Sequence, residues 1–290
     1  MIDRPVFIVG MPRSGTTVLR DILARMPGFA TTTEVTRKAP VCMPLLRALS
    51  PFYRGEHRPV EAGSMWDRFV RGDTDVLGAA DATPAARAFY TQAARNVLRL
   101  YGNPRFLAKC PRNGLRMDFL LEIFPDARFI HLVRDARAVC RSVLEKRGGK
   151  TGADGWWDVR PADWRQWVAL DPVAAVAHQW DSVVRAVADR GTTLPRAQYR
   201  EIRYEDFVAD PVSSIRQVAL FCDTDWPETD IRTHTHSVQS RNDKWGRVFN
   251  GEQLGVMAEI AGETMRRFGY NPGATDAASA DAGWPAQSRS

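Results

Sequence analysis

The fold is decided by the stretch Val6-Phe7-Ile8-Val9-Gly10-Met11-Pro12-Arg13-Ser14-Gly15-Thr16-Thr17. It opens with β-branched and aromatic residues, which predict a strand over 6–9, and passes through a Pro/Gly turn into helical apolar spacing over 16–24. Gly10 and Gly15 have the G-x-x-x-x-G spacing of a phosphate-binding loop between a strand and a helix. Because N–H groups at a helix N-terminus attract anions, the stretch predicts an anion site after the first strand.

The cation of this loop is an arginine instead of a lysine. Thr16 stands where ATPases and kinases carry the lysine that reaches the β- and γ-phosphates. An ordinary glycine-rich turn is the structural alternative, but the flanking strand and helix favour a binding loop. Ser14, Gly15, Thr16 and Thr17 are therefore predicted to hold a phosphate group, with Arg13 beside it.

Further along the chain, apolar strands alternate with amphipathic helices. Strands are predicted over 105–109, 128–133 and 198–204, and helices over 84–101, 115–124, 135–144, 173–188 and 211–221. This order predicts an α/β fold, a P-loop-like parallel sheet flanked by helices on both faces. We expect one domain over 1–272, with a tryptophan-rich insertion at about 148–172, and a disordered tail over 273–290.

Composition limits the class of protein. The 290 residues are 44% hydrophobic and 26% charged, which is typical of a globular domain and excludes a collagenous, coiled-coil or disordered chain. No apolar run reaches the roughly 18 residues of a membrane span, and no leader pattern opens the sequence, so we expect a cytoplasmic protein. The widely spaced cysteines predict buried free thiols instead of a zinc site.

The net charge is +6, and 35 arginines accompany only five lysines. Arginine suits bidentate capture of phosphate or sulfate, although a GC-rich genome gives the same bias. A nucleic-acid-binding module is compatible with this charge. Because the basic residues are scattered and no nucleic-acid motif is present, we expect no nucleic-acid partner.

A second cationic site, separate from the first, is predicted where the strand over 128–133 ends. Arg134 follows that strand directly, and Ser142 lies about two turns along the next helix, roughly 12 Å further on. Ligands of open α/β sheets bind at such strand ends. A surface ion pair is the alternative for Arg134, but the loop at Arg13 favours one ligand held at both of its ends.

Together these motifs resemble the donor site of sulfotransferases that use 3′-phosphoadenosine 5′-phosphosulfate (PAPS). Pro-Arg-Ser-Gly-Thr-Thr over 12–17 resembles their 5′-phosphosulfate loop, and Arg134 with Ser142 resembles their 3′-phosphate site. From about Pro5 to Pro272, the motif order is similar to that of protein-tyrosine sulfotransferases and their bacterial relatives. The resemblance implies PAPS as donor, adenosine 3′,5′-bisphosphate as product, no required metal, and a homodimer.

The resemblance also implies catalytic roles. Glu34, 21 residues after Arg13, stands where that group carries its catalytic glutamate, and Lys109 stands where it carries an active-site lysine. Glu34 would act as general base, while Arg13 and Lys109 would neutralise charge on the bridging oxygen and the sulfuryl group. Arg37 and Lys38 would contact an acidic acceptor, with Arg37 one position later than in the family pattern.

The resemblance also places Tyr204 where that group's tyrosine contacts the 3′-phosphate, and Lys146 where a further basic contact is expected. The match is looser from Ser240 onward, where Ser240, Lys244 and Arg247 are alternatives for the last phosphosulfate contacts. His131 is either a rival base or a packed core histidine, and the latter is favoured within its apolar run. His234 and His236 have the spacing of a metal pair in an otherwise polar stretch, but a metal is the less favoured interpretation.

The sequence thus predicts a PAPS-dependent O-sulfotransferase that works by in-line displacement. A peptidyl tyrosine is the favoured acceptor, and a glycan, lipid or natural-product hydroxyl is the alternative. A P-loop kinase is the runner-up, which the missing loop lysine opposes. The tryptophans of the insertion either wall the acceptor site or pack a helix onto the core.

Overall fold

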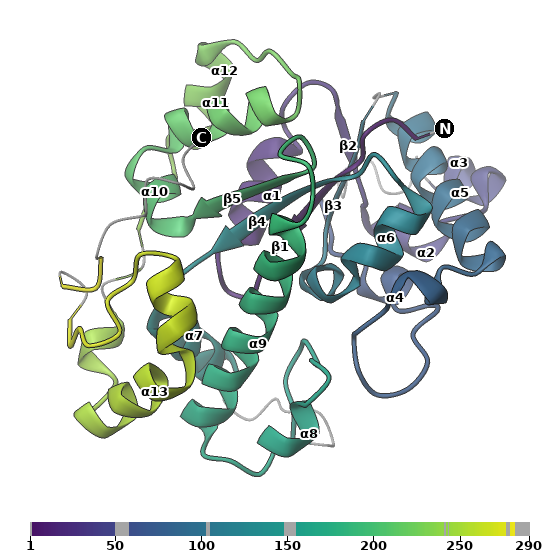
Figure 1. Ribbon diagram of the computed structural model, residues 1–290. Helices are drawn as coiled ribbons and strands as arrows, with labels where there is room; N and C mark the ends of the chain where they lie inside the picture. The colour runs from purple at the N-terminus through teal and green to yellow at the C-terminus, as the bar shows by residue number, and fades with distance from the viewer. Residues whose placement is uncertain are drawn as a thin grey trace.

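Parallel strands form one sheet that is covered by helices on both faces (Figure 1). The computed structural model describes residues 2–49, 58–102, 105–147, 155–240, 242, 244–276 and 279–281. In these ranges the strand order is β2-β3-β1-β4-β5, with all neighbours parallel. The strands are β1 (Val6–Val9), β2 (Phe29–Thr31), β3 (Arg105–Lys109), β4 (Arg128–Val133) and β5 (Tyr199–Arg203). The predicted α/β class with a P-loop-like parallel sheet is confirmed.

The helices mostly follow the predicted spacing. They are α1 (Thr16–Leu23), α2 (Glu34–Lys38), α3 (Met43–Leu49), α4 (Gly63–Trp66), α5 (Pro84–Tyr101), α6 (Met117–Ile123), α7 (Ala136–Arg147), α8 (Trp164–Trp167), α9 (Pro172–Thr192), α10 (Tyr204–Ala209), α11 (Pro211–Phe221), α12 (Glu228–Thr235) and α13 (Gly251–Arg267), with 3₁₀ turns η2 (Ala79–Asp81), η3 (Pro111–Arg116) and η4 (Trp245–Arg247). The helix predicted over 115–124 is divided between η3 and α6. Gly114 of η3 packs closely against α9, where a Cβ would lie 2.7 Å from Val187.

Strand β1 is buried on both of its faces. Val6 and Ile8 pack into a hydrophobic cluster with α1, α10 and α11, whereas Phe7 and Val9 pack into another with α5 and α6. The ring of Phe7 has no exposed surface and lies 5.6–6.5 Å from four other aromatic rings. The two-residue alternation therefore anchors helices on both sides of the central strand.

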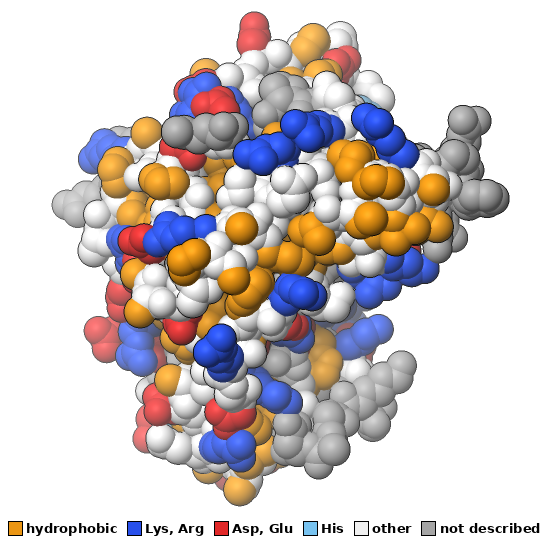
Figure 2. All heavy atoms as spheres, turned by 90° about the vertical axis from the view of Figure 1, so that its right-hand side faces the viewer, with side chains coloured by type: hydrophobic (Ala, Val, Ile, Leu, Met, Phe, Trp, Pro, Cys, Tyr) orange, Lys and Arg blue, Asp and Glu red, His pale blue; other side chains and the backbone are white. Residues whose placement is uncertain are grey.

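A smaller cluster supports α2. Val35 and Ala39 pack against Leu46 of α3, away from the main core. Figure 2 shows the side of the molecule that carries α3 and α5, where a hydrophobic patch is bordered by Lys and Arg side chains. Val41 and Leu45 are among the exposed apolar residues of this region, at 44% and 45%.

The tryptophans of the predicted insertion pack onto α9. Trp156 and Trp164 are buried with Ala175, and their ring centroids lie 5.7 Å apart. The indole N–H of Trp156 donates to the Val159 carbonyl at 2.8 Å. These contacts support core packing over an acceptor wall for both side chains. Residues 148–154 of the predicted insertion lie outside the described residues.

The chain after α13 corrects the predicted tail. Ala274 and Ala280 are buried, and the Asn271 N–H donates to the Ala280 carbonyl at 2.8 Å. The tail therefore does not begin at Gly273. Ala274 and Ala280 pack into the same cluster as residues of α7 and α13. The sequence did not indicate this packing, because these alanines follow no helical or strand period. Residues 282–290 lie outside the described residues.

Two further expectations concern cysteines and membranes. All four cysteines are free thiols, and Cys110, Cys140 and Cys222 are buried as predicted, whereas Cys42 is exposed. Among the described helices, none combines the length and the apolar character needed to cross a bilayer.

Replacing Phe7 by alanine should lower the free energy of unfolding by about 3–5 kcal/mol, because it leaves a cavity among buried aromatic rings. Urea denaturation followed by tryptophan fluorescence measures this change. The matched control is Leu220→Ala on α11, where the side chain is 71% exposed. This control should stay within about 0.5 kcal/mol of the parent, and equal losses in both variants would contradict the proposed core.

Candidate functional site

The predicted site residues lie at the carboxyl ends of the strands. In the order of the sheet they are Glu34 after β2, Lys109 at the end of β3, Arg13 after β1, Arg134 after β4 and Tyr204 after β5. Neighbouring strands lie about 4.8 Å apart. One edge of the sheet therefore carries all of these groups, with Glu34 and Lys109 on one side of Arg13 and the other two on the opposite side.

The loop after β1 has a backbone that few residues adopt. Gly15 has φ +94°, and a Cβ at this position would lie 2.6 Å from the ring of Tyr204. Arg13 also has a positive φ, 74°, which is unfavourable for a residue with a side chain. The hydroxyl of Ser14 is buried without a hydrogen-bond partner in the described residues. A bound phosphate would satisfy such a group, so the loop fits the predicted anion.

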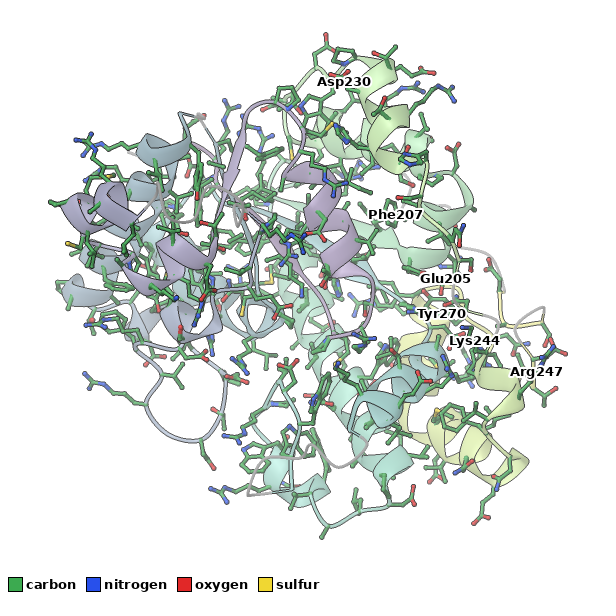
Figure 3. The ribbon with its side chains drawn as sticks, turned by 180° about the vertical axis from the view of Figure 1, so that it is seen from behind. Glu205, Phe207, Asp230, Lys244, Arg247 and Tyr270 are labelled. Carbon is green, nitrogen blue, oxygen red and sulfur yellow. The ribbon has the colours of Figure 1, made fainter. Side chains whose placement is uncertain are left out.

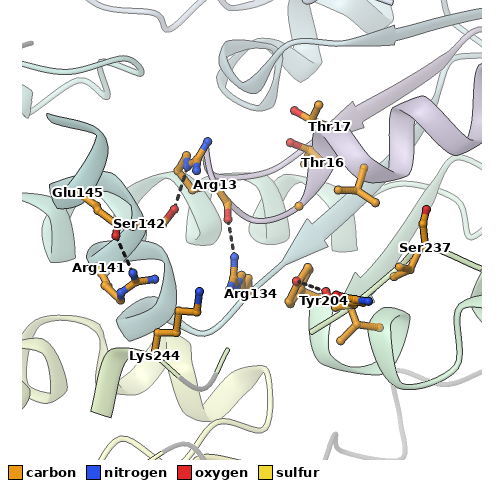
Figure 4. A pocket seen from close by; sticks show the side chains of 15 residues that line it. Arg13, Thr16, Thr17, Arg134, Arg141, Ser142, Glu145, Tyr204, Ser237 and Lys244 are labelled. Carbon is orange, nitrogen blue, oxygen red and sulfur yellow. Dashed lines mark hydrogen bonds and ion pairs between the residues drawn. The ribbon is translucent and has the colours of Figure 1, made fainter. Parts of the chain in front are cut away.

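A pocket of about 390 Å³ opens beside this loop (Figure 4). The predicted residues that line it are Arg13, Gly15, Thr16, Thr17, Arg134, Ser142, Tyr204 and Lys244. The lining also contains residues that the sequence did not indicate: Val18, Arg141, Glu145, Val208, Ser237, Val238 and Gln239. Arg141 adjoins the predicted Ser142, but no motif marks the segment 237–239.

The two predicted cationic sites form one pocket. The Arg13 Nε donates to the Ser142 hydroxyl at 2.9 Å, and an Arg134 guanidinium N–H donates to the Arg13 carbonyl at 3.1 Å (Figure 4). The expectation of separate sites is therefore wrong. Helix α7 runs back past the phosphate loop, which brings Ser142 against it.

Arg134 is held by its surroundings. Its guanidinium lies 4.2 Å from the centre of the Tyr204 ring, within reach of a cation–π interaction. The indole N–H of Trp180 donates to the Arg134 carbonyl at 3.0 Å. Burial lowers the pKa of Arg134, so an anion that enters the pocket would meet a poorly hydrated cation.

The predicted base is paired with the predicted acceptor-binding residues. Glu34 is the first residue of α2, and Arg37 donates to both of its carboxylate oxygens, with Nε at 2.9 Å from Oε2. The Lys38 ammonium lies 3.7 Å from Oε1. The hydrogen bond from Arg37 is the main reason why the pKa of Glu34 is lowered.

Lys109 has a partner that the sequence did not reveal. Its side chain is only 3% exposed, and its ammonium forms an ion pair with Glu61. Asp158 lies nearby, 3.6 Å from Arg112, and burial raises the pKa of Asp158 to about 6. Glu61 comes from an irregular stretch before α4, so no periodic pattern could have marked it.

Several candidates do not line this pocket. Of the phosphosulfate alternatives, Lys244 is in the described lining, whereas Ser240 and Arg247 are not. The other predicted residues absent from it are Ser14, Glu34, Arg37, Lys38, Lys109 and Lys146.

The predicted histidines also have definite positions. His131 is buried, its Nδ1 lies 2.8 Å from the Tyr199 hydroxyl, and burial lowers its pKa to about 3. It is the packed core histidine that its apolar run favoured. His234 and His236 belong to no group of three metal-binding side chains in the described ranges.

Comparison with known proteins defines the class. Residues 5–228 match the sulfotransferase family, and the chain belongs to this family. The protein-tyrosine sulfotransferase of Drosophila melanogaster is 23% identical, over 92% of this chain and 52% of its own. The nodulation protein NoeE of Sinorhizobium fredii is 26% identical, over 73% and 48%. The chain therefore spans about half the length of these two relatives.

Solved structures show the same fold. The sulfotransferase STF9 of Mycobacterium avium has a TM-score of 0.61 at 16% identity, covering 92% of this chain and 77% of that one. Mouse sulfotransferase SULT7A1, crystallised with adenosine 3′,5′-bisphosphate (PAP), has a TM-score of 0.53 at 15% identity, covering 92% and 84%. The predicted sulfotransferase fold is confirmed.

Replacing Arg37 by alanine should raise the pKa of Glu34 toward its ordinary value, because the main hydrogen bond to the carboxylate is lost. Carboxyl-carbon NMR titration measures the shift. Lys38→Ala is the matched control and should produce a smaller rise, since the ammonium is 3.7 Å away. Equal rises would contradict the assignment.

The same lowered pKa fixes a direction for stability. The pKa of Glu34 is lower in the folded protein than in the unfolded chain. Its pairing with Arg37 therefore stabilises the fold at pH values above the pKa of the unfolded chain. This stabilisation is lost as the pH falls through the pKa of the folded protein.

Proposed function

We propose that this chain is a PAPS-dependent O-sulfotransferase. The observation that carries the proposal is the single pocket that joins the phosphate loop, through Arg13, to Arg134 and Ser142. A nucleotide with phosphates on both its 5′ and 3′ positions would place one group at each of these elements. Family membership and the PAP in the mouse relative support the same donor.

The reaction follows from the order of groups along the sheet edge. The acceptor oxygen forms a bond to sulfur while the bond from sulfur to the bridging oxygen of the 5′-phosphate breaks in line. Arg13 would neutralise the charge that develops on the bridging oxygen, and Lys109 would do so on the sulfuryl group. Glu34 would accept the proton of the acceptor hydroxyl. Lys109 has to exchange its contact with Glu61 for the sulfuryl oxygens in this step.

The pairing of Glu34 supports an acidic acceptor. A carboxylate whose pKa is lowered by Arg37 is a weak base. An acceptor with its own carboxylates would draw Arg37 and Lys38 away from Glu34 and restore its basicity. We therefore propose a tyrosyl peptide with acidic neighbours, and a glycan, lipid or natural-product hydroxyl is the alternative. A cytoplasmic location and a homodimer stay predictions from the sequence.

Adenosine 3′,5′-bisphosphate should bind at least about tenfold more tightly than ATP, because Arg134 and Ser142 would contact the 3′-phosphate that ATP lacks. Isothermal titration calorimetry measures both affinities. Arg134→Ala should remove most of the preference. Equal affinity for the two nucleotides, or magnesium-dependent ATP turnover, would instead favour the kinase interpretation.

Glu34→Gln should lower kcat by about 10² to 10⁴ with a tyrosyl acceptor, while binding of adenosine 3′,5′-bisphosphate stays unchanged, since only the proton acceptor is lost. Mass spectrometry detects the added sulfuryl group on acidic and neutral tyrosyl peptides, simple phenols and sugars. Glu122→Gln is the control, because that carboxylate pairs with Arg87 outside the pocket. Full turnover by Glu34→Gln would assign the base elsewhere, and transfer only to sugars would favour the alternative acceptor.

A further inference from the structure

A chain of hydrogen bonds connects Arg134 to a carboxylate behind the pocket. The Arg134 Nε donates to Asn242 Oδ1 at 2.8 Å, and the Asn242 amide donates in turn to Glu205 Oε1. The Tyr270 hydroxyl donates to Glu205 Oε2 at 2.6 Å. Figure 3 shows Glu205 and Tyr270 beside each other, one on α10 and the other just after α13. Three segments far apart in sequence therefore meet behind the nucleotide-binding arginine.

Glu205 is held from several directions. Besides the two side-chain donors, the Asp135 backbone N–H lies 3.3 Å from Oε1. Burial raises the pKa of Glu205, whereas the hydrogen bond from Tyr270 lowers it. A carboxylate that is withdrawn from water is stable only when donors surround it. Its position is therefore fixed by these contacts, and the position of Asn242 is fixed with it.

The amide between Arg134 and Glu205 has a chemical consequence. An amide oxygen is a neutral acceptor, so it orients the guanidinium without cancelling its charge, whereas a carboxylate at that position would compete with a phosphate. The Tyr204 ring and the Arg13 carbonyl contact the same guanidinium from other directions. Asn242 thereby orients Arg134 without placing a carboxylate directly against its Nε.

The segment after α13 completes the arrangement. The Arg203 guanidinium lies 4.5 Å from the centre of the Tyr270 ring and pairs with Asp281 at 3.0 Å. Tyr270 and Asp281 also form a backbone β-bridge. The residues that were expected to be a tail therefore hold Tyr270 against Glu205.

We propose that Asn242 and Glu205 are positioning residues, which fix Arg134 toward the 3′-phosphate of the nucleotide, and that Tyr270 holds Glu205 for this purpose. The proposal rests on the proposed function, since it takes the 3′-phosphate as the ligand of Arg134. Under this proposal, recognition of the 3′-phosphate depends on side chains that do not themselves line the pocket.

Asn242→Ala should reduce the preference for adenosine 3′,5′-bisphosphate over adenosine 5′-monophosphate by about tenfold, because a misplaced Arg134 loses its charged hydrogen bond. Calorimetry with the full chain measures both affinities, and the affinity for the monophosphate should stay within about twofold. Asn250→Ala is the matched control. Asn250 caps α13, accepting from the Gln253 N–H at 2.9 Å, and it lies outside the hydrogen-bond chain. Its preference should equal that of the parent.

A second pair of variants separates positioning from general loss of structure. Tyr270→Phe keeps the ring and removes one hydrogen bond, so it should reduce the preference in the same direction but by less than Asn242→Ala. In an Arg134→Ala background, Asn242→Ala should have no further effect on the preference, because the two act as one unit.

Each outcome has one meaning. No preference for the 3′-phosphate in the parent protein would overturn the proposed function. If the parent shows the preference, three results would overturn the positioning role alone. Asn242→Ala could retain the preference, or Asn250→Ala could lose as much of it as Asn242→Ala. The third is that Asn242→Ala lowers the preference further in the Arg134→Ala background.

Discussion

The parallel pairing of β1 between β3 and β4 is the constraint on which the site depends. Parallel strands end at the same edge, so the residues that follow them are neighbours however far apart they lie in the chain. Because β1 is central, its loop lies between Lys109 on one side and Arg134 on the other. The rigidity of this arrangement comes from the burial of both faces of β1, since alternate side chains anchor different helix layers.

Several of the predicted catalytic or binding cations already have a protein partner. Arg37 contacts Glu34, Lys109 contacts Glu61, and Arg13 contacts Ser142. Lys109 in particular needs its partner, because its side chain is only 3% exposed and a buried charge is costly without one. A substrate that binds Arg37 or Lys109 would therefore have to replace a contact with a protein carboxylate. This exchange is the basis of the proposed preference for an acidic acceptor, because a neutral ligand offers Arg37 and Lys38 no anion in place of Glu34.

Local patterns predicted what local physics controls. The strands over 105–109 and 128–133 and the helix over 211–221 have the predicted bounds, because continuous apolar runs and a helix-starting proline are visible in a short window. Strand β2 was missed, since three residues are too few to show a period. The packed segment after Gly273 was also missed. Its alanines stabilise the fold by filling space in a hydrophobic cluster. Alanine is small and common in every kind of structure, so the sequence alone does not mark such residues as buried.

The sequence by itself determined the fold class, the phosphate loop and most of the residues at the strand ends, because glycine spacing and apolar periodicity are properties of neighbouring residues. Only the tertiary structure decided that Arg13 and Ser142 share one pocket, that Glu61 pairs with Lys109, and that Asn242 links Arg134 to Glu205. These contacts join segments separated by dozens of residues. Their partners are chosen by which side chains reach one another once the helices have packed, and no short pattern contains that information.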